Sequence, residues 1–109
     1  KPYRYGGNNP KGFDCSGLVY YSFSRAGMQV PRSTEAQRKA ALPVPANKLR
    51  TGDLLFFDQE GKRSSHVAIY VGDGAFVHAP STGKRVRTDR LVDPYWKTHF
   101  VGARRFSGL

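Results

Sequence analysis

The stretch DCSGLVYY, residues 14–21, holds the only cysteine of the chain, Cys15, directly before an apolar run. The apolar side chains of this run follow the spacing of a helix: Leu18, Val19, Phe23 and Ala26. Gly27 suits the position that follows a helix end, so we predict a helix over residues 15–27. The partial positive charge at a helix N-terminus favours thiolate over thiol, and this position therefore suits a nucleophile.

The elements after this helix indicate a sheet. Thr34 and Gln37 have the spacing of a capping box, which predicts a second short helix from about residue 35 to residue 41, ended by Pro43 and Pro45. Asp53 is expected to have a structural role at the start of a buried strand. The predicted strands cover residues 53–58, 66–71, 75–78, 85–88 and 99–106, with a polar loop at 59–65. Helices first and strands later predict an α+β fold with an antiparallel sheet.

The two strands HVAIYV, residues 66–71, and AFVH, residues 75–78, each carry one histidine. We predict a three-residue loop, GDG at 72–74 with Gly74 left-handed, because this loop pairs residue 68 with His78. His66 then lies one diagonal step from His78 on the same face of the sheet. A two-residue turn at 73–74 would place the histidines on opposite faces. The other face, with Val67, Ile69, Val71, Ala75 and Val77, is expected to be the core.

Composition limits the class of protein. A chain of 109 residues predicts a single domain over 1–109, and no run approaches the ~18 apolar residues that a membrane span needs. The formal net charge is +10, which predicts attraction to an acidic partner. A single cysteine excludes a disulfide within the chain. Because the chain starts at Lys1 and shows no signal-peptide pattern, we expect a processed or trimmed piece without its targeting segment.

The chain resembles the NlpC/P60 family of cell-wall peptidases. Six strings carry the resemblance, in the family's order: YRYGG (3–7), FDCSGLV (13–19), VPRS (30–33), GDLLFF (52–57), HVAIYVGDG (66–74) and FVHA (76–79). The resemblance implies a papain-like fold, in which N-terminal helices pack on a mostly antiparallel sheet of about five to six strands. Residues after 79 add no string to this match.

The resemblance also assigns roles within a thiol peptidase. Cys15 would be the nucleophile, His66 the base that activates it, and His78 the group that orients the base. Tyr3 would line the site beside the sulfur, Asp14 and Ser16 would help to hold the amino end of the substrate, and Arg32 would pair with a substrate carboxylate. The backbone N–H of Cys15 is the natural oxyanion donor.

The implied substrate is a peptidoglycan stem peptide, cleaved next to D-glutamate, most often at the γ-D-glutamyl–diaminopimelate bond. No cofactor is required, and no nucleic-acid partner is expected. The spacing of Cys15, His66, His78 and His99 matches no compact ligand motif, so no metal is predicted. We expect a monomer that acts in the periplasm, in secreted form or at the cell wall.

Two other classes of protein stay open at this point. One is a different thiol enzyme on the same scaffold, such as an amidase that cuts between sugar and peptide, or an acyltransferase. The other is a non-catalytic basic module that binds the cell wall. The basic residues Lys84, Arg85, Arg87 and Arg90 are interpreted as a solvated face, and a binding stripe for acidic polymers is the alternative. His99 is interpreted as a surface or packing residue.

Overall fold

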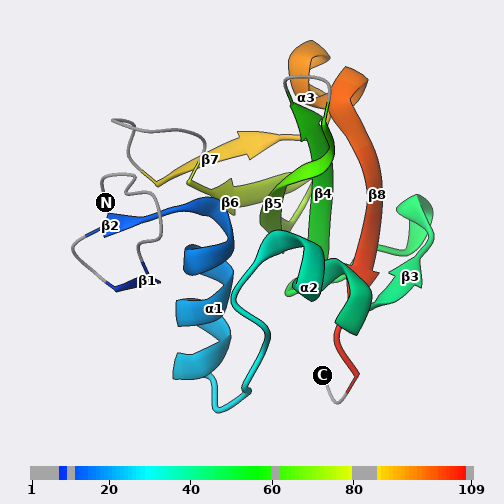
Figure 1. Cartoon of the computed structure of the whole chain (residues 1–109). Coiled ribbons are helices and arrows are strands. Elements are labelled where there is room, and N and C mark those ends of the chain that lie inside the picture. Colours follow the sequence, from blue (N-terminus) through cyan, green and yellow to red (C-terminus); the bar gives the residue numbers. More distant parts are fainter. Residues whose placement is uncertain (1–7, 10–11, 60–61, 80–85, 108–109) are drawn as a thin grey trace.

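A six-stranded antiparallel sheet forms the centre of the computed structural model, which describes residues 8–9, 12–59, 62–79 and 86–107 (Figure 1). Its strand order is β3-β8-β4-β5-β6-β7. The strands are β3 (Leu42–Val44), β4 (Leu54–Gln59), β5 (Lys62–Gly72), β6 (Ala75–His78), β7 (Arg87–Arg90) and β8 (Phe100–Arg105). Two short strands, β1 (Asn8–Asn9) and β2 (Gly12–Phe13), pair separately before the first helix. The predicted α+β fold with an antiparallel sheet is confirmed.

Helices α1 (Cys15–Arg25) and α2 (Thr34–Ala40) lie together on one side of the sheet, and α3 (Pro94–His99) lies at one end of it (Figure 1). Helix α1 begins and ends close to the predicted bounds, and Gly27 takes the left-handed conformation (φ 87°) that a residue after a helix end requires. A 3₁₀ turn, η1 (Ala46–Lys48), separates β3 from β4.

The predicted capping box at the start of α2 is wrong. Ser33 is the N-cap, and its side chain accepts a hydrogen bond from the backbone N–H of Ala36. The helix therefore begins one residue earlier than expected, which turns Thr34 and Gln37 toward α1 instead of toward the helix end. The predicted loop at 59–65 is also too long, because β5 already begins at Lys62.

The β5–β6 hairpin keeps the predicted register by a different route. Ile69 pairs with Val77 and Tyr70 with Phe76, as expected, but the loop is a two-residue turn between Gly72 and Ala75. Both turn residues have positive φ, 54° at Asp73 and 76° at Gly74. A bulge between Tyr70 and Gly72 adds one residue to β5 and so restores the register beyond the turn. The three-residue loop was wrong, whereas the shared face of the histidines was right.

Both faces of the sheet are packed, so the assignment of the core to one face was incomplete. The face toward α1 and α2 carries a buried cluster that includes Val19, Phe23, Phe56 and Val67. The histidine face carries a second buried cluster with Leu55, Phe57, Phe76 and, from α3, Trp96. Helix α3 was not predicted, because it is one and a half turns long and its signals are local: an Asp93 cap followed by Pro94.

Asp53 precedes β4 and has the structural role expected of it. Its carboxylate, which is 1% exposed, accepts hydrogen bonds from Arg105 Nε at 2.6 Å and Nη2 at 2.8 Å, and from the backbone N–H of Arg50 at 2.9 Å. Burial alone would raise the pKa of Asp53, but these hydrogen bonds outweigh it and leave the pKa below its ordinary value. The ion pair ties the start of β4 to the end of β8.

Candidate active site

His66 on β5 and His78 on β6 are in direct contact. His66 Nε2 lies 2.8 Å from His78 Nδ1, which is hydrogen-bonding distance between the two rings. The side chains are almost completely enclosed, with 2% of His66 and none of His78 exposed. Because one ring nitrogen must donate and the other accept, this contact fixes the tautomers of the two rings relative to each other.

Asp89 on β7 fixes the direction of that hydrogen bond. Its Oδ2 lies 2.7 Å from His78 Nε2, and an ionised carboxylate only accepts, so Nε2 of His78 donates. Neutral His78 then presents an unprotonated Nδ1, which accepts from His66 Nε2. The remaining nitrogen of His66, Nδ1, carries a lone pair and is the atom that can take a proton from a neighbouring group.

Arg87 holds Asp89 in place from the same strand. Its Nε lies 3.0 Å from Oδ2 and its Nη2 donates to Oδ1 at 3.0 Å, so the guanidinium contacts both carboxylate oxygens. Arg87 had been interpreted as part of a solvated face. Its side chain is indeed 59% exposed, but it also orders the carboxylate behind the histidines.

Trp96 of α3 covers both imidazoles. It stacks on His66 with ring centroids 5.6 Å apart and meets His78 edge-on at 4.8 Å. This enclosure keeps water from the rings and disfavours their charged forms. Burial, followed by the proximity of His78, lowers the pKa of His66 to about 3. Burial also lowers the pKa of His78, against the hydrogen bond with Asp89, which raises it. His66 is therefore an unprotonated base at neutral pH.

Cys15 is the first residue of α1 and is half-buried. Its Sγ lies 3.6 Å from Thr34 Oγ1 on α2, and no hydrogen bond joins it to His66 in this structure. The first turn of α1 nevertheless lies beside the end of β6, because Leu18 forms a buried pair with Ala79, the residue that follows His78. Cys15 itself packs against the cluster that contains Val67, whose side chain points to the opposite face of β5 from His66.

Three of the predicted substrate-binding residues meet at the start of α1. Asp14 is the N-cap, and its Oδ1 accepts from the backbone N–H of Gly17 at 2.7 Å and from Arg32 Nη2 at 3.0 Å. Arg32 Nη1 donates to Ser16 Oγ at 2.9 Å. This cluster fixes the first turn that carries the thiol, and a role of these residues toward substrate stays a prediction. Tyr3 lies outside the described residues.

Gln37 connects α2 to the same turn. It is completely buried, and its Nε2 donates to the backbone carbonyl of Ser16 at 3.0 Å and of Pro31 at 2.8 Å. Together with the Thr34 contact to Sγ, this bond holds α2 against the first turn of α1. The position of the thiol therefore depends on both helices.

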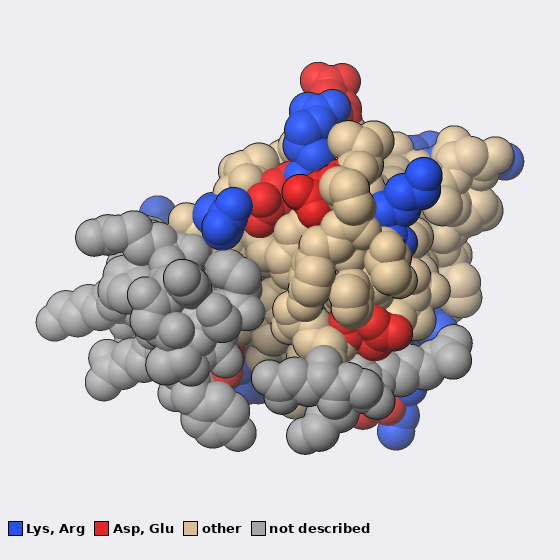
Figure 2. All heavy atoms as spheres, turned by 90° about the horizontal axis from the view of Figure 1, so that it is seen from above, with Lys and Arg blue, Asp and Glu red and all other residues tan. Residues whose placement is uncertain are grey.

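Among the described residues, no further group of titratable side chains suggests a metal site. No three histidine, cysteine, aspartate or glutamate side chains in this part of the chain gather in a way that could hold a metal ion. On the face shown in Figure 2, acidic and basic side chains are interspersed. Of the four basic residues interpreted as a solvated face, Lys84 and Arg85 lie outside the described residues, and Arg90 donates to the backbone carbonyl of Asp73. His99 stacks on Tyr95, as a packing residue would.

Asp89 and Trp96 are the site residues that the sequence analysis missed. Asp89 pairs with Phe76 across β6 and β7, so it shares the histidine face and lies diagonal to His78. An acidic residue inside a basic stretch, directly after the strand predicted at 85–88, was the available signal. Trp96 had no such signal, because its position depends on where a short helix meets the sheet.

Comparison with known proteins identifies the family. The model of the NlpC/P60 family matches residues 1–105, so the chain belongs to the NlpC/P60 family. It is 43% identical over 110 residues to the murein DD-endopeptidase MepH of Escherichia coli, and 41% identical over 106 residues to a gamma-D-glutamyl-L-lysine dipeptidyl-peptidase of Bacillus subtilis. These matches cover 96% and 95% of this chain but only 41% and 36% of the two relatives, so the chain spans less than half of either.

Solved structures agree with this assignment. An NlpC/P60 family protein from Bacillus cereus superposes with a TM-score of 0.88 at 36% sequence identity, covering 96% of this chain and 35% of that one. The NlpC/p60 domain of the peptidoglycan hydrolase SagA gives a TM-score of 0.81 at 33% identity, covering 96% and 86%. The papain-like NlpC/P60 fold expected from the sequence is confirmed.

Asp89 acts through the histidines, which makes it a positioning residue with a specific signature. In Asp89→Asn, the amide nitrogen can face His78 Nε2 and force it to accept, which moves a proton onto Nδ1 of both rings. On the hypothesis that Cys15 gives its proton to His66 Nδ1, the rate of iodoacetamide alkylation near pH 7 is then expected to fall roughly tenfold.

Asp73→Asn is the matched control for this variant, because Asp73 is exposed in the turn and its φ of 54° suits asparagine. Asp89→Glu keeps the charge and is expected to retain more reactivity than Asp89→Asn. If Asp89→Asn were alkylated as fast as the control, the carboxylate would not set the tautomers.

The buried histidines also predict how stability depends on pH. In the unfolded chain an imidazole takes up a proton near pH 6.5, whereas folded His66 does so only near pH 3, and folded His78 below its ordinary value. Below pH 6.5 the unfolded state therefore binds more protons than the folded state. The free energy of unfolding consequently decreases as the pH is lowered, by up to about 1.4 kcal/mol per pH unit for each histidine.

Urea unfolding between pH 7.5 and pH 5 measures this slope above the range where most carboxylates titrate. His66→Asn removes one of the two groups and is expected to give a smaller slope than the wild type. A free energy of unfolding that stays constant across this interval would contradict the neutral, buried state of the pair.

Proposed function

We propose that this domain is a thiol peptidase that hydrolyses peptide bonds of peptidoglycan, with Cys15 as nucleophile, His66 as base and His78 as the orienting group. The enclosed hydrogen-bond chain from Asp89 through His78 to His66 carries the proposal, since it leaves a lone pair on His66 Nδ1. Membership of the NlpC/P60 family and relatives named as endopeptidases support it.

The proposed reaction passes through an acyl-enzyme. His66 Nδ1 takes the thiol proton as Sγ bonds to the substrate carbonyl carbon, and then gives that proton to the leaving nitrogen as the C–N bond breaks. Water hydrolyses the resulting thioester, with His66 again transferring the proton, and this restores the thiol. In free enzymes the hydrogen bond between nucleophile and base is often long and shortens when substrate binds. Here Sγ contacts Thr34 Oγ1 in the free protein, so it must turn from Thr34 toward His66 when substrate binds.

The first turn of α1 is suited to stabilise the charge that develops on the carbonyl oxygen. The Asp14 side chain occupies the backbone N–H of Gly17, and the Asp14 carbonyl occupies that of Leu18. The N–H groups of Cys15 and Ser16 precede any helical acceptor, so they are the donors left for an oxyanion. We assign the Cys15 N–H to this role.

Within this class we propose cleavage of the γ-D-glutamyl–diaminopimelate bond. The name of the gamma-D-glutamyl-L-lysine dipeptidyl-peptidase relative supports a bond next to D-glutamate. A relative named as a DD-endopeptidase favours a second candidate, the D,D-bond of the peptide crosslink. Both substrates are rich in carboxylates, which suits the net charge of +10. Since peptidoglycan lies outside the cytoplasm, we propose that the domain acts in the periplasm or at the cell wall.

Digestion of defined muropeptides, followed by mass spectrometry, tests this function. We expect an uncrosslinked disaccharide tripeptide to yield a disaccharide dipeptide, and Cys15→Ala to lose all turnover. His66→Ala should be nearly as inactive, and His78→Ala should be impaired less because water can partly replace an orienting group. His99→Ala is the matched control and should keep wild-type turnover.

Other products would reject parts of the proposal in distinct ways. If only crosslinked dimers were cleaved, the assigned cleavage site would be the D,D-bond of the crosslink and not the γ-D-glutamyl–diaminopimelate bond. Release of the peptide from the sugar would indicate an amidase. Salt-sensitive wall binding that survives Cys15→Ala, with no hydrolysis by the wild type and no thiolate-selective labelling, would indicate a binding module.

A further inference from the structure

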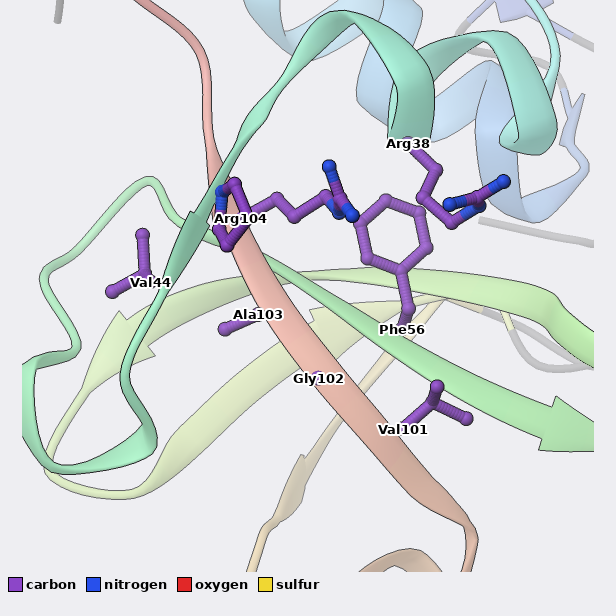
Figure 3. A pocket seen from close by; sticks show the side chains of 8 residues that line it. Arg38, Val44, Phe56, Val101, Gly102, Ala103 and Arg104 are labelled. Atoms are coloured by element: carbon purple, nitrogen blue, oxygen red, sulfur yellow. The ribbon is translucent and has the colours of Figure 1, made fainter.

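A cavity of about 260 Å³ lies on the helix side of the sheet, between α2 and strands β3, β4 and β8. Figure 3 shows the side chains that line it: the ring of Phe56 lies between the guanidinium groups of Arg38 and Arg104. Gly102 on β8 also lines it, and a Cβ added there would meet no atom within 4 Å. The cavity is therefore open above Gly102.

Arg104 is the unusual group in this cavity. Its Nη1 donates to the backbone carbonyl of Ala41 at 2.9 Å, while its Nε and Nη2 donate to no acceptor among the described residues. No acidic side chain pairs with it among the described residues, although the next residue, Arg105, binds Asp53 with both Nε and Nη2. A half-buried guanidinium with two open donors and no counter-charge is suited to an anion.

Arg38 supplies a further donor on the opposite side of the Phe56 ring. Its Nε and Nη2 bind Glu35 at 3.1 and 2.6 Å, and its Nη1 has no acceptor within the described part of the chain. Glu35 does not line the cavity, and neither does any other acidic side chain in the described part of the chain. The open donors of the two arginines therefore lie on either side of the Phe56 ring, in a cavity that no acidic side chain of the described residues lines.

The separation between the cavity and the thiol is comparable to the length of a short peptide segment. Arg38 is four residues after Thr34 on α2, and Thr34 contacts Cys15 Sγ. Four helical residues rise about 6 Å, and two residues of an extended peptide span about 7 Å. A peptide bound for attack by Cys15 would thus place a group about 7 Å from the attacked carbonyl, on the diaminopimelate side of the bond, near the cavity.

We propose that this cavity is a subsite that binds a carboxylate of the peptide substrate, held by Arg104 Nε and Nη2 and by Arg38 Nη1. The subsite rests on the proposed function for the identity of its ligand, since peptidoglycan stem peptides carry free carboxylates on the residues next to the proposed cleavage point. It would favour substrates with a free carboxylate over their amidated forms, and so make the cavity a determinant of specificity.

Titration of the inactive Cys15→Ala chain, followed by NMR of the backbone amides of residues 101–104, tests binding separately from turnover. The probes are the tripeptide L-alanyl-γ-D-glutamyl-diaminopimelate, the same tripeptide with its diaminopimelate carboxyls amidated, and inorganic phosphate. We expect the free tripeptide to shift these amides, and the amidated tripeptide to bind at least tenfold more weakly.

Two variants in the Cys15→Ala background probe the cavity in different ways. Arg104→Gln removes the charge, and Gly102→Val fills the space while keeping both arginines; each is expected to weaken binding of the free tripeptide about tenfold. Arg25→Gln is the matched control, because it removes the same charge from the exposed end of α1. Equal weakening in Arg104→Gln and Arg25→Gln would overturn the subsite and leave only an effect of net charge.

The remaining outcomes separate this inference from the proposed function. Phosphate binding as tightly as the tripeptide would overturn the assignment to peptide carboxylates. Hydrolysis by the wild type with an unchanged KM in Arg104→Gln would overturn the subsite and leave the function standing. Shifts at residues 101–104 in Cys15→Ala, together with no muropeptide hydrolysis by the wild type, would reject the function and keep a carboxylate site.

Discussion

The hydrogen bond between His66 and His78 depends on the register of one hairpin, and the chemistry of the site depends on that hydrogen bond. A shift of one residue between β5 and β6 would move one ring to the opposite face of the sheet. The bulge between Tyr70 and Gly72 prevents this, because it compensates for a turn that is one residue shorter than the register needs. The loop is therefore part of the site, although it lies at the far end of the hairpin from the histidines.

The carboxylate behind the pair gives it a direction. Without Asp89, either ring could donate to the other, and His66 could hold its proton on either nitrogen. With Asp89 accepting from His78, and Arg87 contacting both oxygens of Asp89, the protons line up on the Nε2 atoms. Enclosure by Trp96 then keeps both rings neutral. Three strands, β5, β6 and β7, and one helix, α3, thus determine the protonation state of one nitrogen, His66 Nδ1.

Local patterns in the sequence predicted the elements whose causes are local. The helix of Cys15, its end before Gly27, the buried strand predicted at 53–58 and the shared face of His66 and His78 follow from periodicity, capping and register. The Ser33 cap and the two-residue turn were missed because neighbouring residues compete for the same role. Asp89, Trp96 and the contact of Thr34 with the thiol were missed because they join elements distant in the sequence.

The protonation state of His66 is the central claim of this account, and nitrogen NMR of histidine-labelled wild-type protein measures it directly. Near pH 7.5 the account predicts that His66 and His78 both carry their proton on Nε2, with Nδ1 unprotonated in each ring. A His66 ring protonated on Nδ1 would contradict it, because that nitrogen could then accept no proton from Cys15.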